Sequence, residues 1–293
     1  MASPLAQRLE ALAARAGFGL LKALPVDAAS GLGGRVARAV GPRLKVTEPA
    51  RANLRMAFPD WDAARIEATI RGMWDNLGRT AGEFPHVPAF TVGRPGDDAR
   101  ITVENAEVID RLADSGPVIW FSAHIANWET GPMGVGGIGR PMHVVYRAAN
   151  NPHTDWVYAA GRRFAASLIP KGAAGARRMA QVLRHKEHLG VLVDQKLNDG
   201  IPVDFFGRPA MTGTAVALFA LKYRCPLVPA HPVREDGARF RVVVEEPLPL
   251  PDSGDRTADT AELMARVNAR VEAWIRDHPE QWLWLHRRWP ESP

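Results

Sequence analysis

A histidine and a glutamate five positions apart carry the most specific chemistry in this chain of 293 residues. His124 follows an apolar run at 118–122 that is typical of a strand, and Glu129 lies in the first turn of the helix predicted after it. A carboxylate on one imidazole nitrogen fixes the tautomer and stabilises the imidazolium, which leaves the other nitrogen as a general base. The spacing predicts a His124–Glu129 pair for acid–base chemistry, and a structural histidine is the alternative.

Polar residues also follow the other predicted strands, which end at 146, 170 and 193. These residues are Arg147, Lys171, Asp194 and Gln195, with Arg162 on a helix between them. Ligands of parallel α/β sheets bind beyond the carboxyl ends of the strands, and an arginine fork suits phosphate or carboxylate. We therefore predict an anion or substrate site close to His124. A surface ion pair is the alternative for each residue taken alone.

The sequence lacks the motifs of three other kinds of site: a metal site, a serine hydrolase and a dinucleotide-binding loop. His124, Glu129, His143 and Asp194 have no two-ligand helical spacing and no cysteine pair beside them, so we predict no metal site. No G-x-S-x-G elbow indicates a serine hydrolase. The glycines at 134–139 match G-x-G-x-x-G but lack a strand before and a helix after them, so we interpret them as a flexible loop beside the site. We expect no cofactor.

The composition excludes a disordered chain, because 46% of the residues are hydrophobic and the net charge is only +5. A single cysteine, Cys225, excludes a disulfide framework and favours a reducing compartment. No apolar run approaches the length of a spanning helix, and charges at Arg8, Glu10 and Arg15 interrupt any signal-peptide core. These features predict a protein that is cytosolic or attached to a membrane surface.

The basic charge is concentrated near the start of the chain. Residues 1–60 hold nine Lys and Arg against four Asp and Glu, and the remainder is neutral. Residues 3–24 form the pattern of an amphipathic helix, with an apolar stripe of Leu5, Leu9, Leu12, Ala16, Leu20 and Leu24. Core packing and burial in a membrane interface both remain open for this stripe. No aromatic residues are interleaved with the basic ones, so we predict no nucleic-acid partner.

The order of predicted elements favours an α/β fold. Helices are predicted near 28–40, 48–57 and 62–84, and strands alternate with helices beyond residue 95. Alternation of this kind predicts a mostly parallel central sheet flanked by helices. We expect one domain over 1–293, in which 1–90 form a helical, basic, membrane-facing portion and 91–293 form the catalytic core.

The sequence resembles the bacterial lipid A biosynthesis acyltransferases of the lauroyl/myristoyl type, within the lysophospholipid acyltransferase superfamily. The matching segments are Asn53-Leu54, Phe58-Pro59, His124-x-x-Asn127-Trp128-Glu129, Tyr146-Arg147-x-x-x-Asn151-Pro152, Ile169-Pro170-Lys171, Val193-Asp194-Gln195, 205–210, 226–229 and 279–289. They cover nearly the whole chain in order. The segment from His124 to Glu129 (the His124 box) and the segment 279–289 (the terminal box) are the most specific of them.

The resemblance implies acyl transfer from acyl-acyl carrier protein, or acyl-CoA, to a hydroxyl of a lipid A precursor. It implies His124 as general base and Glu129 as its partner in an HxxxxE motif. The implied substrate-binding residues are Asn127, Arg147, Asn151, Arg162, Lys171, Asp194 and Gln195. The implied partners are the carrier protein, a glycolipid acceptor and the anionic inner membrane, with peripheral attachment at its cytoplasmic face. Acylation of another glycolipid or a lysophospholipid, and a non-catalytic lipid- or carrier-binding module, are the alternatives.

Two departures from the family pattern stand out. Many members have Phe-Gly where this chain has Ile125-Ala126, which predicts an altered backbone beside His124. Many members also begin with an apolar helix able to enter the bilayer, whereas residues 3–24 are interrupted by arginines.

Overall fold

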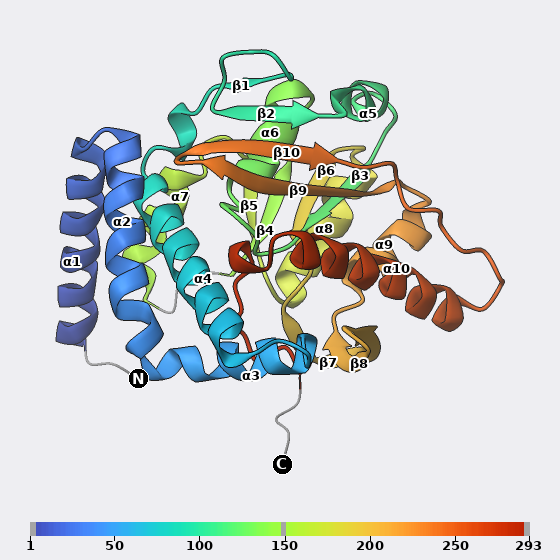
Figure 1. Ribbon diagram of the computed structural model, residues 1–293. Helices are drawn as coiled ribbons and strands as arrows, with labels where there is room; N and C mark the ends of the chain where they lie inside the picture. The colour runs from blue at the N-terminus through green and yellow to red at the C-terminus, as the bar shows by residue number, and fades with distance from the viewer. Residues whose placement is uncertain (1–3, 148–150, 290–293) are drawn as a thin grey trace.

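The computed structural model describes residues 4–147 and 151–289 and has the predicted α/β architecture (Figure 1). Eight strands form the central sheet in the order β1-β2-β10-β9-β3-β6-β4-β5. Their bounds are β1 Val92–Gly93, β2 Ile101–Glu104, β3 Val118–Ser122, β4 His143–Tyr146, β5 Ser167–Pro170, β6 His188–Leu192, β9 Leu227–Asp236 and β10 Arg239–Val244. Neighbours are parallel except β9 and β10, which are joined by a tight turn at Gly237 (φ 51°). The predicted, mostly parallel sheet is confirmed.

The helices cover both faces of the sheet and build the N-terminal portion (Figure 1). The α-helices are α1 Pro4–Ala23, α2 Val26–Val40, α3 Glu48–Ala57, α4 Ala63–Glu83, α5 Ala106–Leu112, α6 Thr130–Ile138, α7 Asp155–Gly161, α8 Ala173–Arg184, α9 Ala215–Tyr223 and α10 Arg256–Asp277. The 3-10 turns are η1 Gly41–Arg43, η2 Lys45–Thr47, η3 Val87–Ala89, η4 Pro152–Thr154 and η5 Pro279–Gln281.

Side chains of the central strand β3 alternate between two hydrophobic clusters. Ile119 and Phe121 belong to the cluster that includes α3, α4, α9 and α10. Val118 and Trp120 belong to the cluster on the other face, with α5, α6 and β10. All four are buried, because successive side chains of a strand point to opposite faces and both faces are covered. This burial makes β3 a rigid base for the residues that follow it.

Helices α2 and α4 pack at unusually close range through glycine. A Cβ atom at Gly33 would lie 2.2 Å from the Gly78 carbonyl oxygen, and one at Gly82 would lie 2.3 Å from the Ala29 carbonyl oxygen. No side chain fits into such a gap, so the two backbones touch directly. The contact fixes α4, whose C-terminal turn reaches the polar site described below.

The glycines of residues 134–139 lie in helix α6 and its C-terminal cap, so their interpretation as a flexible loop was wrong. A Cβ atom at Gly134 would lie 3.0 Å from Val242, and one at Gly137 would lie 3.0 Å from Val92. These positions are small because α6 packs tightly against the strands beneath it. The sequence motif therefore reflects packing of a helix on the sheet.

A hairpin that the sequence analysis did not predict joins β6 to α9. It consists of β7 Lys196–Phe205 and β8 Arg208–Thr212, paired antiparallel outside the central sheet. The first half of β7 is mostly exposed and polar, and only Ile201, Val203 and Phe205 in its second half alternate with more exposed residues, which leaves too short a pattern to predict the whole strand.

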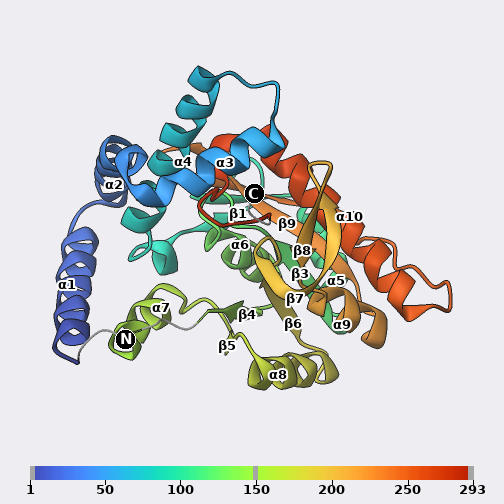
Figure 2. The same cartoon turned by 90° about the horizontal axis from the view of Figure 1, so that it is seen from below.

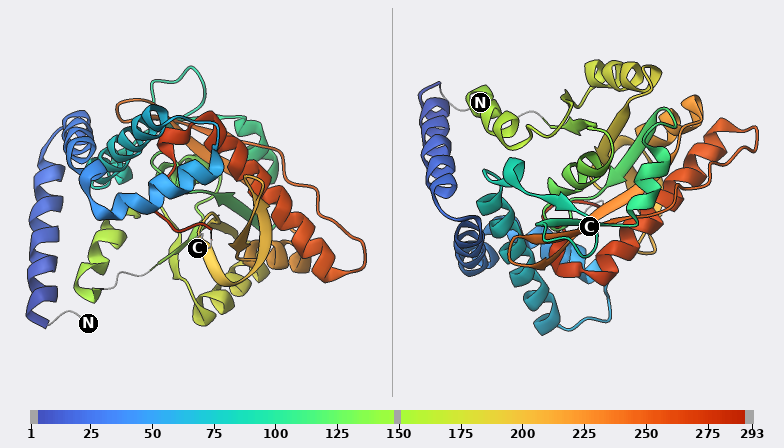
Figure 3. Two further views of the ribbon diagram at one scale, coloured as in Figure 1. Left: turned by 60° about the horizontal axis from the view of Figure 1, so that its bottom comes forward. Right: turned by 90° about the horizontal axis from the view of Figure 1, so that it is seen from above.

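Helix α1 lies at the outer edge of the molecule (Figure 3) and buries little of its predicted apolar stripe. The side chains of Leu9, Leu12 and Leu20 are 58%, 64% and 64% exposed. The opposite side of α1 packs on the segment of η4 and α7, where Phe18 meets Trp156 at a ring separation of 5.3 Å (Figure 2). The side chain of Leu5 lies outside the described residues.

Within the described part of the chain, no helix is both long enough and apolar enough to cross a membrane.

Candidate active site

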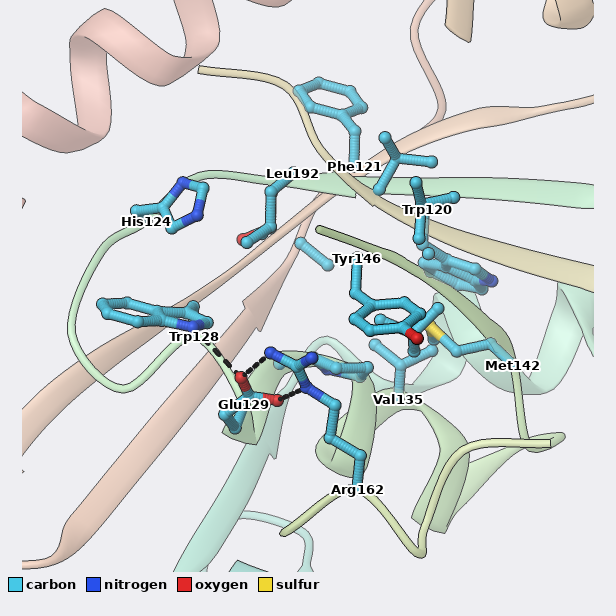
Figure 4. A pocket seen from close by; sticks show the side chains of 18 of the residues that line it. Trp120, Phe121, His124, Trp128, Glu129, Val135, Met142, Tyr146, Arg162 and Leu192 are labelled. Atoms are coloured by element: carbon cyan, nitrogen blue, oxygen red, sulfur yellow. Dashed lines mark hydrogen bonds and ion pairs between the residues drawn. The ribbon is translucent and has the colours of Figure 1, made fainter. Parts of the chain in front are cut away.

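A cavity of about 220 Å³ opens beyond the carboxyl end of β3 and runs between the sheet and α6. Figure 4 shows His124, Trp128 and Glu129 at one end and Trp120 and Met142 at the other. The first end also carries Arg162, which bonds to Glu129, Gln195, which lies beside the His124 ring, and Lys171, which bonds to Gln195. Gly190 lies against Met142 at the second end. Arg147, Val135 and Ala230 also line the cavity. The cavity thus joins a polar mouth to an apolar interior.

His124 and Asp194 meet because their strands are parallel neighbours in register. Ser122 at the end of β3 pairs with Leu192 at the end of β6, so the residues two positions further along lie side by side. The Asp194 Oδ1 atom is 2.8 Å from Nδ1 of the His124 ring, and its Oδ2 accepts the His124 backbone N–H at 2.9 Å. The indole of Trp282 donates to the same Oδ2 at 2.8 Å. The His124 ring is thereby held in one orientation.

Asp194 is a buried and charged partner. Its side chain has no exposed surface, and burial by itself would raise the pKa of the carboxyl group. Attraction to His124 and the hydrogen bonds that His124 donates outweigh burial and lower that pKa well below its usual range. Asp194 therefore carries a negative charge against the imidazole at neutral pH.

The Glu129 carboxylate forms its hydrogen bonds with Arg162 and Trp128, and none is formed between it and the His124 ring in the described structure. Its Oε2 accepts from Nε of Arg162 at 2.7 Å and its Oε1 accepts from the guanidinium at 2.5 Å. Oε1 also accepts from the indole of Trp128 at 3.1 Å, and the Trp128 and His124 rings are 5.2 Å apart. The indole thus contacts both residues (Figure 4). The backbone turns between positions 124 and 129, and Glu129 takes the N-cap position of α6 without a capping hydrogen bond from its side chain.

The structure divides the remaining predicted substrate-binding residues into two groups. Arg147, Arg162, Lys171 and Gln195 line the cavity as expected. Asn127, Asn151 and Asp194 are buried and are not among the residues that line the cavity, although Asp194 bonds to His124 behind it. The Asn127 amide donates to Glu83 at 2.9 Å, and the Asn151 amide donates to the Gln7 carbonyl oxygen at 2.8 Å, which ties α1 to η4.

A second histidine, His286, lies beside His124 and was missed at the sequence level. The two rings are 5.2 Å apart, and Nε2 of Gln195 lies between them, 3.5 Å from His124 Nε2 and 3.3 Å from His286 Nε2. Burial, followed by repulsion from His124, lowers the pKa of His286 to about 4, so the ring is neutral at physiological pH. Its membership of the terminal box at 279–289 was the available signal, but nothing in that box indicated where the chain end folds.

A buried polar network supports the loop after His124. The guanidinium of Arg234 forms a two-point ion pair with Glu83 and donates to the Asn76 amide oxygen at 2.9 Å. The Asn76 amide donates to the carbonyl oxygen of Ala126 at 3.0 Å, and Glu83 accepts from Asn127. Helix α4 therefore holds residues 126–127 in place through side chains alone.

Ala126 has a left-handed backbone, with φ of 48°. Its N–H donates to the Gln281 carbonyl oxygen at 2.9 Å, and its own carbonyl oxygen accepts from Asn76. A residue with a Cβ atom is strained in this region, where glycine is favoured. The departure from Phe-Gly at 125–126 therefore places alanine in the conformation that suits glycine best.

Comparisons with known proteins agree with this geometry. The model of the bacterial lipid A biosynthesis acyltransferase family matches residues 8–291. A lipid A biosynthesis acyltransferase of Haemophilus influenzae is 27% identical over 83% of this chain and 77% of its own length. The lipid A biosynthesis palmitoleoyltransferase of Escherichia coli is 26% identical over 92% and 87%, and the lauroyltransferase of the same organism is 26% identical over 90% and 84%.

We predict that Ala126→Gly stabilises the protein. Relief of the left-handed alanine, partly offset by the greater freedom of glycine in the unfolded chain, should raise the free energy of unfolding by about 0.5–1 kcal/mol. Urea denaturation measures this change. Ala123→Gly, at a buried position of ordinary backbone geometry, is the matched control and should be destabilising. A less stable Ala126→Gly protein would show that the strain argument is wrong.

Proposed function

The chain belongs to the bacterial lipid A biosynthesis acyltransferase family, and from that membership we propose that it transfers a fatty acyl chain to a hydroxyl of a lipid A precursor, with His124 as general base. The observation that carries the proposal is a single cavity with an imidazole at its polar mouth and an apolar interior behind it. An acyl chain requires the second feature and activation of a hydroxyl requires the first.

The acyl chain occupies the interior between Trp120, Val135 and Met142, which are all buried. Its thioester carbonyl then lies at the mouth, near His124. The acceptor hydroxyl gives its proton to Nε2 of His124 as its oxygen attacks the carbonyl carbon, because Nδ1 is already bonded to Asp194. The C–S bond breaks as the ester forms, and the departing thiolate takes the proton from the His124 imidazolium, which restores the neutral base. The amide of Gln195 and the ammonium of Lys171 supply N–H donors at this end of the cavity for the oxyanion.

Charged residues at the mouth bind the phosphate groups of the acceptor. Arg147 and Lys171 are exposed there, next to the polar end of the cavity. Although Lys171 reaches solvent, its ammonium is partly desolvated by the residues around the mouth, and this desolvation lowers its pKa from the usual value. Attraction to Asp194 opposes the shift, and repulsion from Arg147 adds to it. Glu129 acts through Arg162, because both of its carboxylate oxygens hold that guanidinium at the cavity wall.

The acyl donor is acyl carrier protein, an acidic partner. Residues 171–186 contain five basic residues and no acidic one. Arg177, Arg178 and Arg184 on α8 are exposed, and α8 begins two residues after Lys171 at the cavity mouth (Figure 2). A basic helix at the entrance attracts an acidic carrier and orients its thioester arm.

The N-terminal helices attach the enzyme peripherally to the anionic inner membrane at its cytoplasmic face. We call the exposed residues Leu9, Leu12, Leu20, Leu32, Val36 and Val40 the apolar surface of α1 and α2. Basic residues at Arg8, Arg35 and Arg38 are exposed on the same helices. Apolar side chains next to arginines are the composition of a helix that lies in a membrane interface.

Replacement of the base tests the activity. We expect His124→Ala to lower the rate of acyl transfer by ~10²–10⁴, because the hydroxyl loses its proton acceptor. Thiol release from acyl carrier protein, with mass spectrometry of the acylated lipid A precursor, measures the rate. His153→Ala, at an exposed histidine of η4 that does not line the cavity, should leave it unchanged. Near-normal transfer by a folded His124→Ala protein would overturn the proposal.

Charge reversal on α8 tests the donor. The double variant Arg177→Glu/Arg178→Glu should raise KM for acyl carrier protein by about tenfold, equivalent to ~1.4 kcal/mol, without changing kcat. The matched control is the double variant Arg94→Glu/Arg239→Glu, which makes the same charge change near β1, at the edge of the sheet opposite β5. Equal KM values for the two double variants would mean that the carrier docks elsewhere.

Vesicle flotation tests membrane attachment. Binding to anionic phospholipid vesicles should weaken with added salt, because exposed charges more than ~8–10 Å apart are screened at physiological ionic strength. A salt-resistant remainder should persist in the wild type and disappear in Leu9→Ser/Leu12→Ser/Leu20→Ser, which removes apolar burial but keeps the charge. Absence of flotation at low salt would contradict attachment through α1 and α2.

A further inference from the structure

We propose that Asp194 is the positioning residue of His124, the role that the HxxxxE spacing gives to Glu129. This inference rests on the proposed function, because it assigns the carboxylate that supports the base in that reaction. Asp194 comes from a different strand, 70 positions away in sequence, and touches neither the acyl chain nor the cavity wall. It acts on the reaction only through the imidazole.

The hydrogen bonds around Asp194 determine the tautomer of His124. Oδ2 accepts two N–H groups, from the His124 backbone and from Trp282, and Oδ1 is 2.8 Å from the ring Nδ1. An ionised carboxylate can only accept, so Nδ1 carries the proton and Nε2 is left with its lone pair. That lone pair is on the side of Gln195, which lines the cavity.

The other charged and titratable groups near His124 are His286, Lys171 and the Glu129–Arg162 pair. His286 is neutral, since burial and repulsion from His124 hold its pKa at about 4. Lys171 reaches the ring through Gln195, to which it donates at 3.0 Å. Among the described residues, Asp194 is the charged group with a direct hydrogen bond to the ring.

Glu129 is poorly suited to support the imidazolium. Its charge is matched by the Arg162 guanidinium over two hydrogen bonds, and the two side chains are 3% and 10% exposed. The Trp128 indole contacts both Glu129 and the imidazole. Glu129 is paired with an arginine and is separated from the imidazole by an indole, so it stabilises a positive ring much less than Asp194, which is hydrogen-bonded to the ring at 2.8 Å.

Replacement of Asp194 by asparagine changes both charge and tautomer. The amide oxygen can still accept from the His124 backbone and from Trp282, so the amide NH₂ faces Nδ1. Nδ1 must then accept, the ring proton moves to Nε2, and Nε2 can no longer take a proton from the acceptor hydroxyl. Loss of the negative charge also lowers the proton affinity of the ring, because the imidazolium is no longer stabilised.

The test follows the His124 ring directly by NMR in full-length protein labelled with ¹³C-histidine, with its signal assigned by its absence in His124→Gln. Asp194→Asn should move the titration midpoint of His124 to lower pH by about 1–3 units. Glu129→Gln should move it by less. The acidic limb of the kcat/KM profile should shift in the same direction, and kcat should fall by ~10²–10⁴. An unchanged midpoint in Asp194→Asn, or a larger shift in Glu129→Gln, would overturn the assignment.

Trp282→Phe provides an independent variant, for which we expect the titration midpoint of His124 to shift in the opposite direction from that in Asp194→Asn. It removes one N–H donor from Oδ2, so the carboxylate becomes more basic and holds the ring proton more strongly. The His124 midpoint should move to higher pH, whereas a purely structural role of Trp282 predicts no upward shift. A downward shift or no shift would count against the proposal even if Asp194→Asn failed to fold. Because NMR requires no substrate, failure of the proposed acyl transfer would leave this result interpretable.

Discussion

Parallel pairing of β3 with β6 is the constraint on which the site depends. Ser122 opposite Leu192 sets the register, and the N–H of Val193 donates to the Ser122 carbonyl oxygen at 3.0 Å, one step beyond the paired strands. A slip of one residue would turn the side chains after each strand toward opposite faces of the sheet. The His124 imidazole and the Asp194 carboxylate are therefore positioned by backbone hydrogen bonds in the buried centre of the sheet. Their contact does not depend on the ordering of a flexible loop.

The C-terminal segment closes the site from the other side. Trp282 donates to Asp194, the N–H of Leu283 donates to the His124 carbonyl oxygen at 2.9 Å, and the Gln281 carbonyl oxygen accepts from Ala126. The buried Glu83–Arg234 pair supports the same loop through α4. Removal of both charges from water is costly, so such a pair is a weak source of stability. Its value here is geometric, because it connects the N-terminal helices to the loop that carries the base.

The polar mouth and the N-terminal helices are linked through one short segment. Asn151 bonds to α1, Trp156 packs against Phe18, and Arg162 at the end of the same segment lines the cavity. The exposed apolar surface of α1 and α2 and the cavity thus share a structural element. Under the proposed function, this element would connect membrane attachment to the site of acyl transfer.

The sequence alone determined the fold class, the strand that ends at Ser122, and the identity of His124 as the candidate base, because these depend on local periodicity and on residue type. It also placed Arg147, Arg162, Lys171 and Gln195 near one another, since parallel strands end at a common edge. Only the tertiary structure decided which carboxylate meets the imidazole. Spacing favoured Glu129. A left-handed turn at Ala126 and the start of α6 at Glu129 place that side chain against Arg162, while strand register brings Asp194 to His124. Contacts between residues far apart in sequence depend on register and on packing, and neither can be read from the spacing of residues along one segment.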